Sequence, residues 1–269
     1  MLFQLTKIPF LAVLASELQS QFGVTVCSRT IRGRLNERDY NSCKACKKPF
    51  VSEKNRIARL RWAREHLSWT VAQWKQVLWT DESPFVFRWN GNTRVWRKSH
   101  ERYHRDCLAG TIKQDRRIMV WACFAAGGVG SFIRVRGILL KESYKQILIH
   151  HAVPSGKRIL GRGFIFQQDN DPKHTAHIVK DYLSSKEAEG TLKVLSWPSQ
   201  SPDINCIENL WSIVDQNCAN RKPQNEDQLF QILRDAWRSL PSSTLNNLVE
   251  SMPHRCQAVI DAHGYPTKY

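Results

Sequence analysis

Apolar residues recur at helical spacing near the start of the chain. The stretch 11–21 has apolar side chains three or four residues apart, which predicts a helix that Gly23 ends. A second helix is predicted from about residue 25 or 28 to Asn36, with Ile31 and Leu35 facing inward. Two short helices joined by a tight turn that contains glycine are typical of a helix-turn-helix.

A third helix is predicted to begin at Ser52, which is a suitable N-cap residue. Ile57, Leu60 and Leu67 lie on one side of it and are expected to face inward. The basic residues are then expected to face solvent; they are Lys54, Arg56, Arg59, Arg61 and Arg64.

From Val77 onward the pattern changes to short apolar strands separated by turn residues, and later to strands that alternate with helices. The predicted strands are Val77–Thr80, Phe85–Trp89, Arg94–Arg97, Ile118–Phe124, Phe132–Val135, Phe164–Gln167 and Leu192–Ser196. Helices are predicted over Glu142–His151, His174–Leu183, a segment that holds Ile207–Val214, and residues 226–250. This order predicts an α/β fold, with a mixed sheet flanked by helices.

Charge is distributed unevenly along the 269 residues. The chain has 40 Lys and Arg against 24 Asp and Glu, a net charge of +16. Residues 1–75 hold 14 of the basic residues but only 5 of the acidic ones. We therefore expect a partial DNA-binding region over 1–50, a basic helix and connection over 51–76, and a different kind of domain over 77–269.

Basic side chains in the first part of the chain are the candidates for binding double-stranded DNA. The second helix would present Arg29, Arg32 and Arg34 to the major groove, although an ordinary surface helix with arginines has the same pattern. Contacts to phosphates are also predicted for Lys47 and Lys48 in a basic linker and for Arg56 and Arg59 in the third helix.

Cysteine and hydropathy patterns point away from other classes of protein. The eight cysteines are scattered, and a chain of this length does not need disulfides to fold, so free thiols are expected. Cys43 and Cys46 form a single CxxC whose distance from His100 and His104 is unlike that of a zinc finger. Residues 8–15 imitate a short signal peptide, but the buried face of the first helix explains them better, and no membrane span is expected.

Three carboxylates lie where a predicted strand or helix meets the surface. Asp81 follows the strand Val77–Thr80, Asp169 follows the strand near Phe166, and Glu208 enters a helix after a turn. If their strands are neighbours, Asp81 and Asp169 converge at the carboxyl ends of the strands. Three convergent carboxylates suit hard divalent cations, which prefer oxygen ligands. Each one alone also has an ordinary explanation, as a turn residue or as an acidic residue at a helix N-terminus.

The segments around these carboxylates resemble the signature blocks of Tc-like transposases in the mariner superfamily. The longest are Gln167-Gln168-Asp169-Asn170-Asp171-Pro172-Lys173-His174-Thr175 and Trp197-Pro198-Ser199-Gln200-Ser201-Pro202-Asp203-Ile204-Asn205. Shorter blocks agree in order around Asp81, Met119, Glu208, Arg221 and Asn247, so that the resemblance covers about Val24 to Tyr269.

The resemblance implies a ribonuclease-H-like catalytic domain with an Asp-Asp-Glu triad formed by Asp81, Asp169 and Glu208. It implies Mg²⁺, for which Mn²⁺ can substitute, as the cofactor of hydrolysis and strand transfer, and no organic cofactor. It also implies binding of terminal inverted repeats, insertion into TA target sites, a homodimer or higher oligomer on DNA, and a nuclear location.

Several positions depart from the family pattern. The chain is expected to have only the second of two helix-turn-helix units, and Cys206 replaces a proline before Ile207. Between Asp169 and Glu208 lie 38 residues, four more than this branch usually has, and the extra residues are expected in a surface loop at Ser184–Gly190. One alternative to an active transposase is a transposase-derived DNA-binding protein. The other is a hydrolase that acts on sugars with two carboxylates, and the basic N-terminal part of the chain disfavours this second alternative.

Overall fold

A computed structural model describes residues 11–42, 50–86, 98, 117–218, 221 and 223–269. The chain divides into two compact units, residues 1–48 and residues 49–269. The predicted strand Arg94–Arg97, the candidate DNA contacts Lys47 and Lys48, and the CxxC and histidine residues considered for zinc all lie outside the described residues.

The first unit contains two helices, as its hydrophobic pattern predicts. Helix α1 (Leu11–Phe22) ends at Gly23, whose positive φ of 66° is a backbone conformation that glycine adopts without strain. Helix α2 (Ser28–Asn36) buries Ile31, and Leu35 is partly buried. The side chains of Arg29, Arg32 and Arg34 are exposed, and that of Arg34 forms an ion pair with Glu37 at 2.8 Å.

The second unit is built on a five-stranded mixed sheet of order β3-β2-β1-β4-β5. Its strands are β1 (Val77–Val86), β2 (Arg117–Ala125), β3 (Gly128–Val135), β4 (Phe164–Phe166) and β5 (Leu192–Val194). Strand β2 runs antiparallel to β1 and β3, whereas β4 runs parallel to β1 and β5. Phe85 was predicted to begin a separate strand but belongs to β1, which continues through Asp81 to Val86.

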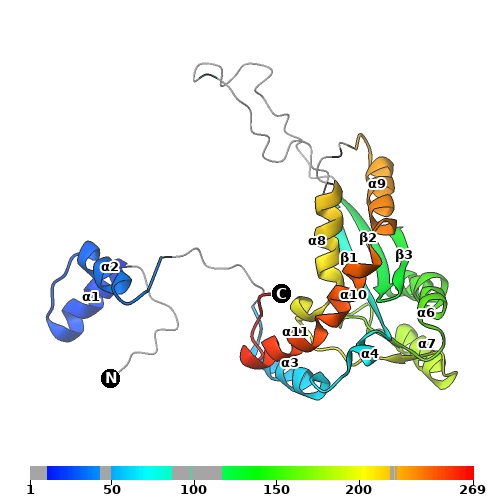
Figure 1. The fold of residues 1–269 in the computed structure, drawn as a ribbon, viewed down its shortest axis with the longest axis horizontal. Helices are drawn as coiled ribbons and strands as arrows, with labels where there is room; N and C mark the ends of the chain where they lie inside the picture. The colour runs from blue at the N-terminus through cyan, green and yellow to red at the C-terminus, as the bar shows by residue number, and fades with distance from the viewer. Residues whose placement is uncertain (1–10, 43–49, 87–97, 99–116, 219–220, 222) are drawn as a thin grey trace. The chain divides into compact units, whose positions relative to one another are not determined.

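Alternation along the central strands divides the core between the two faces of the sheet. One face buries Val77 and Trp79 of β1, and the other buries Leu78 beside Trp121 and Cys123 of β2. Helices cover both faces, so the strands are apolar on both sides (Figure 1).

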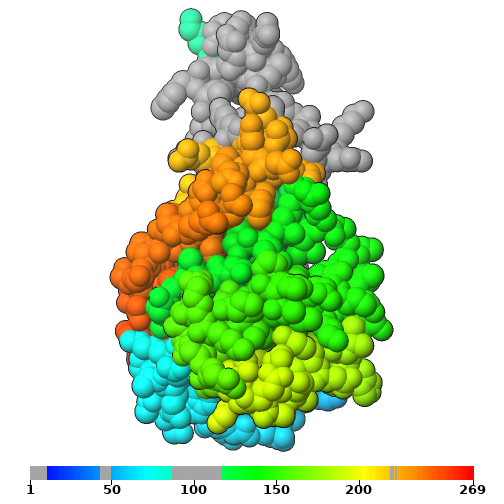
Figure 2. Space-filling model, turned by 90° about the vertical axis from the view of Figure 1, so that its right-hand side faces the viewer, coloured from blue at the N-terminus to red at the C-terminus, as the bar shows by residue number. Residues whose placement is uncertain are grey.

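The helices that contribute to the Trp79 face come from both ends of the second unit. They are α3 (Glu53–His66), α4 (Val71–Trp74), α8 (Ile207–Cys218), α9 (Glu226–Arg238), α10 (Ser242–Glu250) and α11 (Met252–Asp261). The Leu78 face is covered by α5 (Lys141–Ile147), a π-helical turn η3 (Leu148–Ala152), α6 (Val153–Leu160) and α7 (His177–Ala188). Figure 2 views the second unit from the side on which α6 and α7 lie.

Two predictions about the helices are wrong. Helix α3 buries Arg59, Trp62, Ala63 and His66, whereas Ile57 and Leu67 are exposed, so the opposite face packs on the core. The expected surface loop at Ser184–Gly190 is instead helical as far as Ala188, because α7 continues to that residue.

A membrane span was not expected from the hydropathy pattern. Among the residues that the structure describes, no helix has both the length and the apolar character needed to cross a bilayer.

Candidate active site

The three carboxylates predicted from the sequence line one cavity of about 310 Å³. Asp81 lies within β1 rather than after its end, and its partner across the sheet is Ala122 of β2. Asp169 follows β4, the parallel neighbour of β1 on its other side, and Glu208 is the second residue of α8. The fold therefore brings together residues that are up to 127 positions apart.

The loop that carries Asp169 is held against β1 by Gln167 and Thr80. The Gln167 backbone N–H donates to the Leu78 carbonyl, which extends the parallel pairing by one residue. The Thr80 backbone N–H donates to Gln167 Oε1 at 3.1 Å, and the Thr80 hydroxyl donates to the Gln167 carbonyl at 2.8 Å. These bonds fix the chain two residues before Asp169, so its backbone is constrained although it follows the strand.

Asp81 is connected to the start of α8 through Asn205. The Asn205 amide donates to Asp81 Oδ2 at 2.8 Å, and the backbone N–H of Glu82 donates to Asp81 Oδ1 at 2.7 Å. Asn205 Oδ1 also accepts a hydrogen bond of 3.4 Å from the backbone N–H of Ile207, the residue directly before Glu208. The Asn205 side chain thus hydrogen-bonds both to Asp81 and to the first residue of the helix that carries Glu208.

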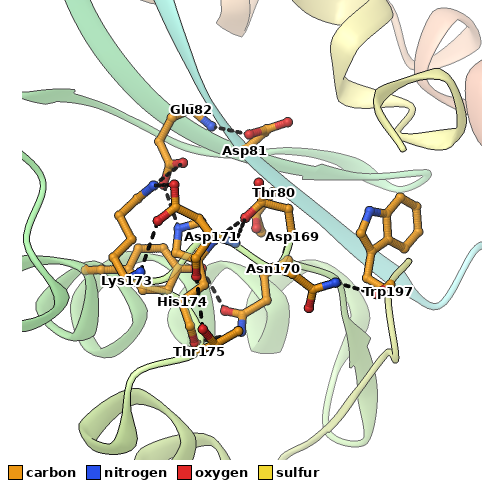
Figure 3. Close-up of polar contacts among 12 residues, drawn as sticks. Thr80, Asp81, Glu82, Asp169, Asn170, Asp171, Lys173, His174, Thr175 and Trp197 are labelled. Atoms are coloured by element: carbon orange, nitrogen blue, oxygen red, sulfur yellow. Dashed lines mark hydrogen bonds and ion pairs between the residues drawn. The ribbon is translucent and has the colours of Figure 1, made fainter. Parts of the chain in front are cut away.

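Asp169 accepts two hydrogen bonds at the same oxygen. Its Oδ1 accepts from the backbone N–H of Asp171 at 3.0 Å and lies 2.5 Å from His174 Nδ1 (Figure 3). The neighbouring Asn170 turns the other way, and its amide donates to the Trp197 carbonyl at 2.6 Å. The loop after β4 is therefore stabilised by hydrogen bonds within the loop and by one to Trp197, in the segment that leads to Glu208.

The pKa values of the three carboxylates are shifted in different directions. Burial raises the pKa of Asp81 well above its usual value, and the charge of Glu208 raises it further. Burial also raises the pKa of Glu208, with a further increase from the charge of Asp169. For Asp169 burial acts in the same direction, but the hydrogen bonds from His174 and the Asp171 N–H, together with the charges of His174 and Lys173, outweigh burial and lower the pKa.

His174 has the complementary shift. Burial alone would lower the pKa of its imidazole, but the hydrogen bonds and charges of Asp169 and Glu82 outweigh burial and raise the pKa to about 9. Sequence reasoning gave His174 and Glu82 no role. The alternation of β1 is the signal that could have identified Glu82, since it directs Glu82 to the sheet face opposite Asp81.

The polar side chains that line the cavity are carboxylates, amides and serine hydroxyls, and among the described residues its lining includes no histidine or cysteine. In the described part of the chain, no three His, Cys, Asp or Glu side chains lie together closely enough to hold one metal ion. Each oxygen of Asp81 accepts one hydrogen bond, Oδ2 from the Asn205 amide and Oδ1 from the Glu82 backbone N–H.

The candidate DNA contacts in α3 have different surroundings. The prediction for Arg59 is wrong, because its side chain is fully buried and forms an ion pair with Asp203. Arg56 is largely covered and pairs with Glu53 on the same helix. Arg29, Arg32 and Arg34 are exposed on α2.

Comparisons with known proteins agree with this organisation. A family model described as a transposase matches residues 11–68, and a model described as DDE superfamily endonuclease matches residues 76–230. The Tc1 transposase of Caenorhabditis elegans is 41% identical over 243 residues, which are 90% of this chain and 88% of that protein. The Tcb2 transposase of Caenorhabditis briggsae is 39% identical over 248 residues, or 91% of this chain and 89% of that one.

The chain belongs to the Tc1 family of DDE transposases. Its fold is also that of the Mos1 transposase in a paired-end complex with the left transposon end, with a TM-score of 0.75 at 18% identity over 96% of this chain and 79% of that one. The catalytic domain of Mos1 mariner transposase gives a TM-score of 0.64 over 83% of this chain and the whole of that one. The predicted α/β fold, the helix-turn-helix segment and the resemblance to Tc-like transposases are confirmed, and the protein is a DDE transposase of the cut-and-paste type.

Proposed function

We propose that Asp81, Asp169 and Glu208 are the catalytic carboxylates of this transposase and hold Mg²⁺, or Mn²⁺ in its place. The observation that carries the proposal is that β1, the loop after β4 and the start of α8 each contribute one carboxylate to the same cavity. In support, solved structures of the Mos1 mariner paired-end complex include one with Mn and one with Mg.

The chemistry of the donors fits a hard divalent cation. Oxygen ligands are those that Mg²⁺ prefers. A cation would offset the burial and the charge of neighbouring carboxylates that raise the pKa of Asp81 and Glu208. A pair of bound ions would activate the attacking oxygen and stabilise the leaving one. The protein itself would position the carboxylates that bind these ions. Asp81 is part of the paired strand β1, and Asn205 hydrogen-bonds both to Asp81 and to the backbone of Ile207, the residue before Glu208.

The substrate in this proposal is double-stranded DNA at transposon ends. Water is the nucleophile of end cleavage, and the 3′-hydroxyl that cleavage exposes is the nucleophile that joins the element to a TA target site. The exposed arginines of α2 would contact the DNA, and two copies of the chain would act on paired ends, as the Mos1 paired-end complex suggests. A nuclear location follows from this substrate.

The proposal is tested by strand cleavage and joining on pre-cleaved and intact transposon ends in Mg²⁺ or Mn²⁺. Asp81→Asn, Asp169→Asn and Glu208→Gln should each abolish both reactions and leave DNA affinity nearly unchanged, because the amide has the same shape but lacks the charge. EDTA should stop the wild-type reaction, and added Mg²⁺ should restore it.

Asp171→Asn is the matched control, because Asp171 lines the same cavity but pairs with Lys173 in the loop. It should retain measurable activity. Full activity in Asp169→Asn would show that the chemistry occurs elsewhere. Binding of ends by the wild-type protein without any joining in either metal would favour a transposase-derived DNA-binding protein.

A further inference from the structure

We propose that His174 is a positioning residue that sets the orientation of the Asp169 carboxylate by connecting it to Glu82. This inference rests on the proposed function, since it assumes that Asp169 binds the metal ion. It assigns a role to two residues that lie outside the three predicted carboxylates.

The imidazole of His174 bridges two carboxylates. Its Nδ1 lies 2.5 Å from Asp169 Oδ1, and its Nε2 lies 3.2 Å from Glu82 Oε1. The His174 side chain is 3% exposed and that of Glu82 is 12% exposed, whereas Asp169 is 48% exposed. The bridge therefore extends from the largely covered Glu82 of β1 to Asp169, which lines the cavity. Figure 3 draws the three side chains.

Surrounding contacts fix the plane of the His174 ring. The ring lies against the Tyr144 ring of α5, with 3.9 Å between the ring centroids. The Tyr144 hydroxyl donates to Gln168 Oε1 at 2.8 Å, and the Gln168 amide donates to the His174 carbonyl at 3.3 Å. Gln168 is the residue directly before Asp169, so the same contacts hold both ends of the loop.

Carboxylate oxygens only accept hydrogen bonds, so a ring between two of them is suited to donate from both nitrogens. The hydrogen bond at Oδ1 restricts rotation of the Asp169 carboxylate and so fixes the direction in which Oδ2 points. Residues that hydrogen-bond to a metal ligand typically contribute about 10–100-fold to metal affinity or activity. Glu82 completes the bridge, and Lys173, 3.4 Å from Glu82 Oε2, offsets part of its charge.

Two substitutions separate the two bonds of the bridge. An asparagine amide reaches about as far as Nδ1, so His174→Asn can keep the bond to Asp169 and loses the one to Glu82. A glutamine amide reaches about as far as Nε2, so His174→Gln can keep the bond to Glu82 and loses the one to Asp169. Mn²⁺ affinity, measured by the paramagnetic resonance signal of free Mn²⁺ without DNA, reports on the metal site to which Asp169 belongs in this proposal.

We expect His174→Gln to raise the Kd for Mn²⁺ by about 10–100-fold and His174→Asn to raise it several-fold less. The Mg²⁺ concentration at half-maximal cleavage should shift in the same order. His177→Asn is the matched control, because the His177 side chain is 97% exposed at the start of α7, and it should leave both values unchanged. Melting temperatures show whether each variant is folded.

Equal effects of His174→Asn and His174→Gln on the Kd, or no effect of either in folded protein, would overturn the positioning role. Asp169→Asn distinguishes this result from failure of the proposed metal site. If Asp169→Asn weakens Mn²⁺ binding but His174→Gln does not, only the positioning role is wrong. If Asp169→Asn leaves Mn²⁺ binding unchanged, both proposals are wrong.

Discussion

Arg59 of α3 and Asp203 of the 3₁₀ turn η4 (Pro202–Ile204) form a buried ion pair with two parallel hydrogen bonds of 2.7 Å. Arg59 also donates to the carbonyls of Gly264 and Gln200, and Asp203 accepts from the backbone N–H of Thr267. The pair thus connects α3 and the C-terminal segment to the turn that precedes Asn205 and Glu208. A residue expected to contact DNA instead supports one side of the active site.

Replacement of Arg59 should destabilise the second unit. Arg59→Ala leaves the buried Asp203 without its partner, and removal of one member of a buried pair typically costs about 3–5 kcal/mol. Denaturant unfolding of the whole protein measures this loss. Arg64→Ala, at an exposed position of the same helix, should change the free energy of unfolding by less than about 0.5 kcal/mol. Equal stability of the two variants, with DNA affinity lost only in Arg59→Ala, would restore the phosphate-contact interpretation.

The same pair predicts a pH dependence of stability. Burial alone would raise the pKa of Asp203, but the hydrogen bond and charge of Arg59 and the hydrogen bonds from Thr267 together outweigh burial, so the folded-state pKa lies below the ordinary value of 3.8. The ionised Asp203 therefore stabilises the fold above pH 3.8, and this contribution is lost as the pH falls through the folded-state pKa.

Asp203→Asn should accordingly reduce the free energy of unfolding at pH 7 and remove part of the loss that the wild type shows below about pH 4. Unfolding curves from pH 7 to pH 3 compare the two proteins. Wild-type and Asp203→Asn curves that run parallel over this whole range would contradict the assigned shift. Asp171→Asn is a useful comparison, because Asp171 belongs to a half-exposed ion pair with Lys173.

DNA binding should depend on α2. We expect simultaneous replacement of Arg29, Arg32 and Arg34 by alanine to weaken binding of transposon ends more than the same change at Lys180, Lys186 and Lys193. Each lost phosphate contact should also lower the slope of log affinity against log salt by about 0.9. Titrations at several salt concentrations measure both effects. Equal losses from the two sets would mean that residues 28–36 are not a recognition helix.

Local patterns were sufficient for much of the site. The apolar runs before Asp81 and Asp169 predicted strands, and Glu208 was correctly expected at the start of a helix. These inferences succeed because strand and helix periodicities are properties of neighbouring residues. The end of α1 was also predictable from local sequence, because the positive φ of Gly23 is a backbone conformation that glycine adopts without strain.

Only the tertiary structure decided which face of α3 is buried. Apolar and basic residues occur on both sides of this helix, so its periodicity did not distinguish them. Arg59 is buried because its partner Asp203, 144 residues away, offsets the cost of removing its charge from water. The His174 bridge has the same origin: Glu82 and Asp169 meet one imidazole because β1 and β4 are neighbours in the sheet, and strand pairing is not determined by either strand alone.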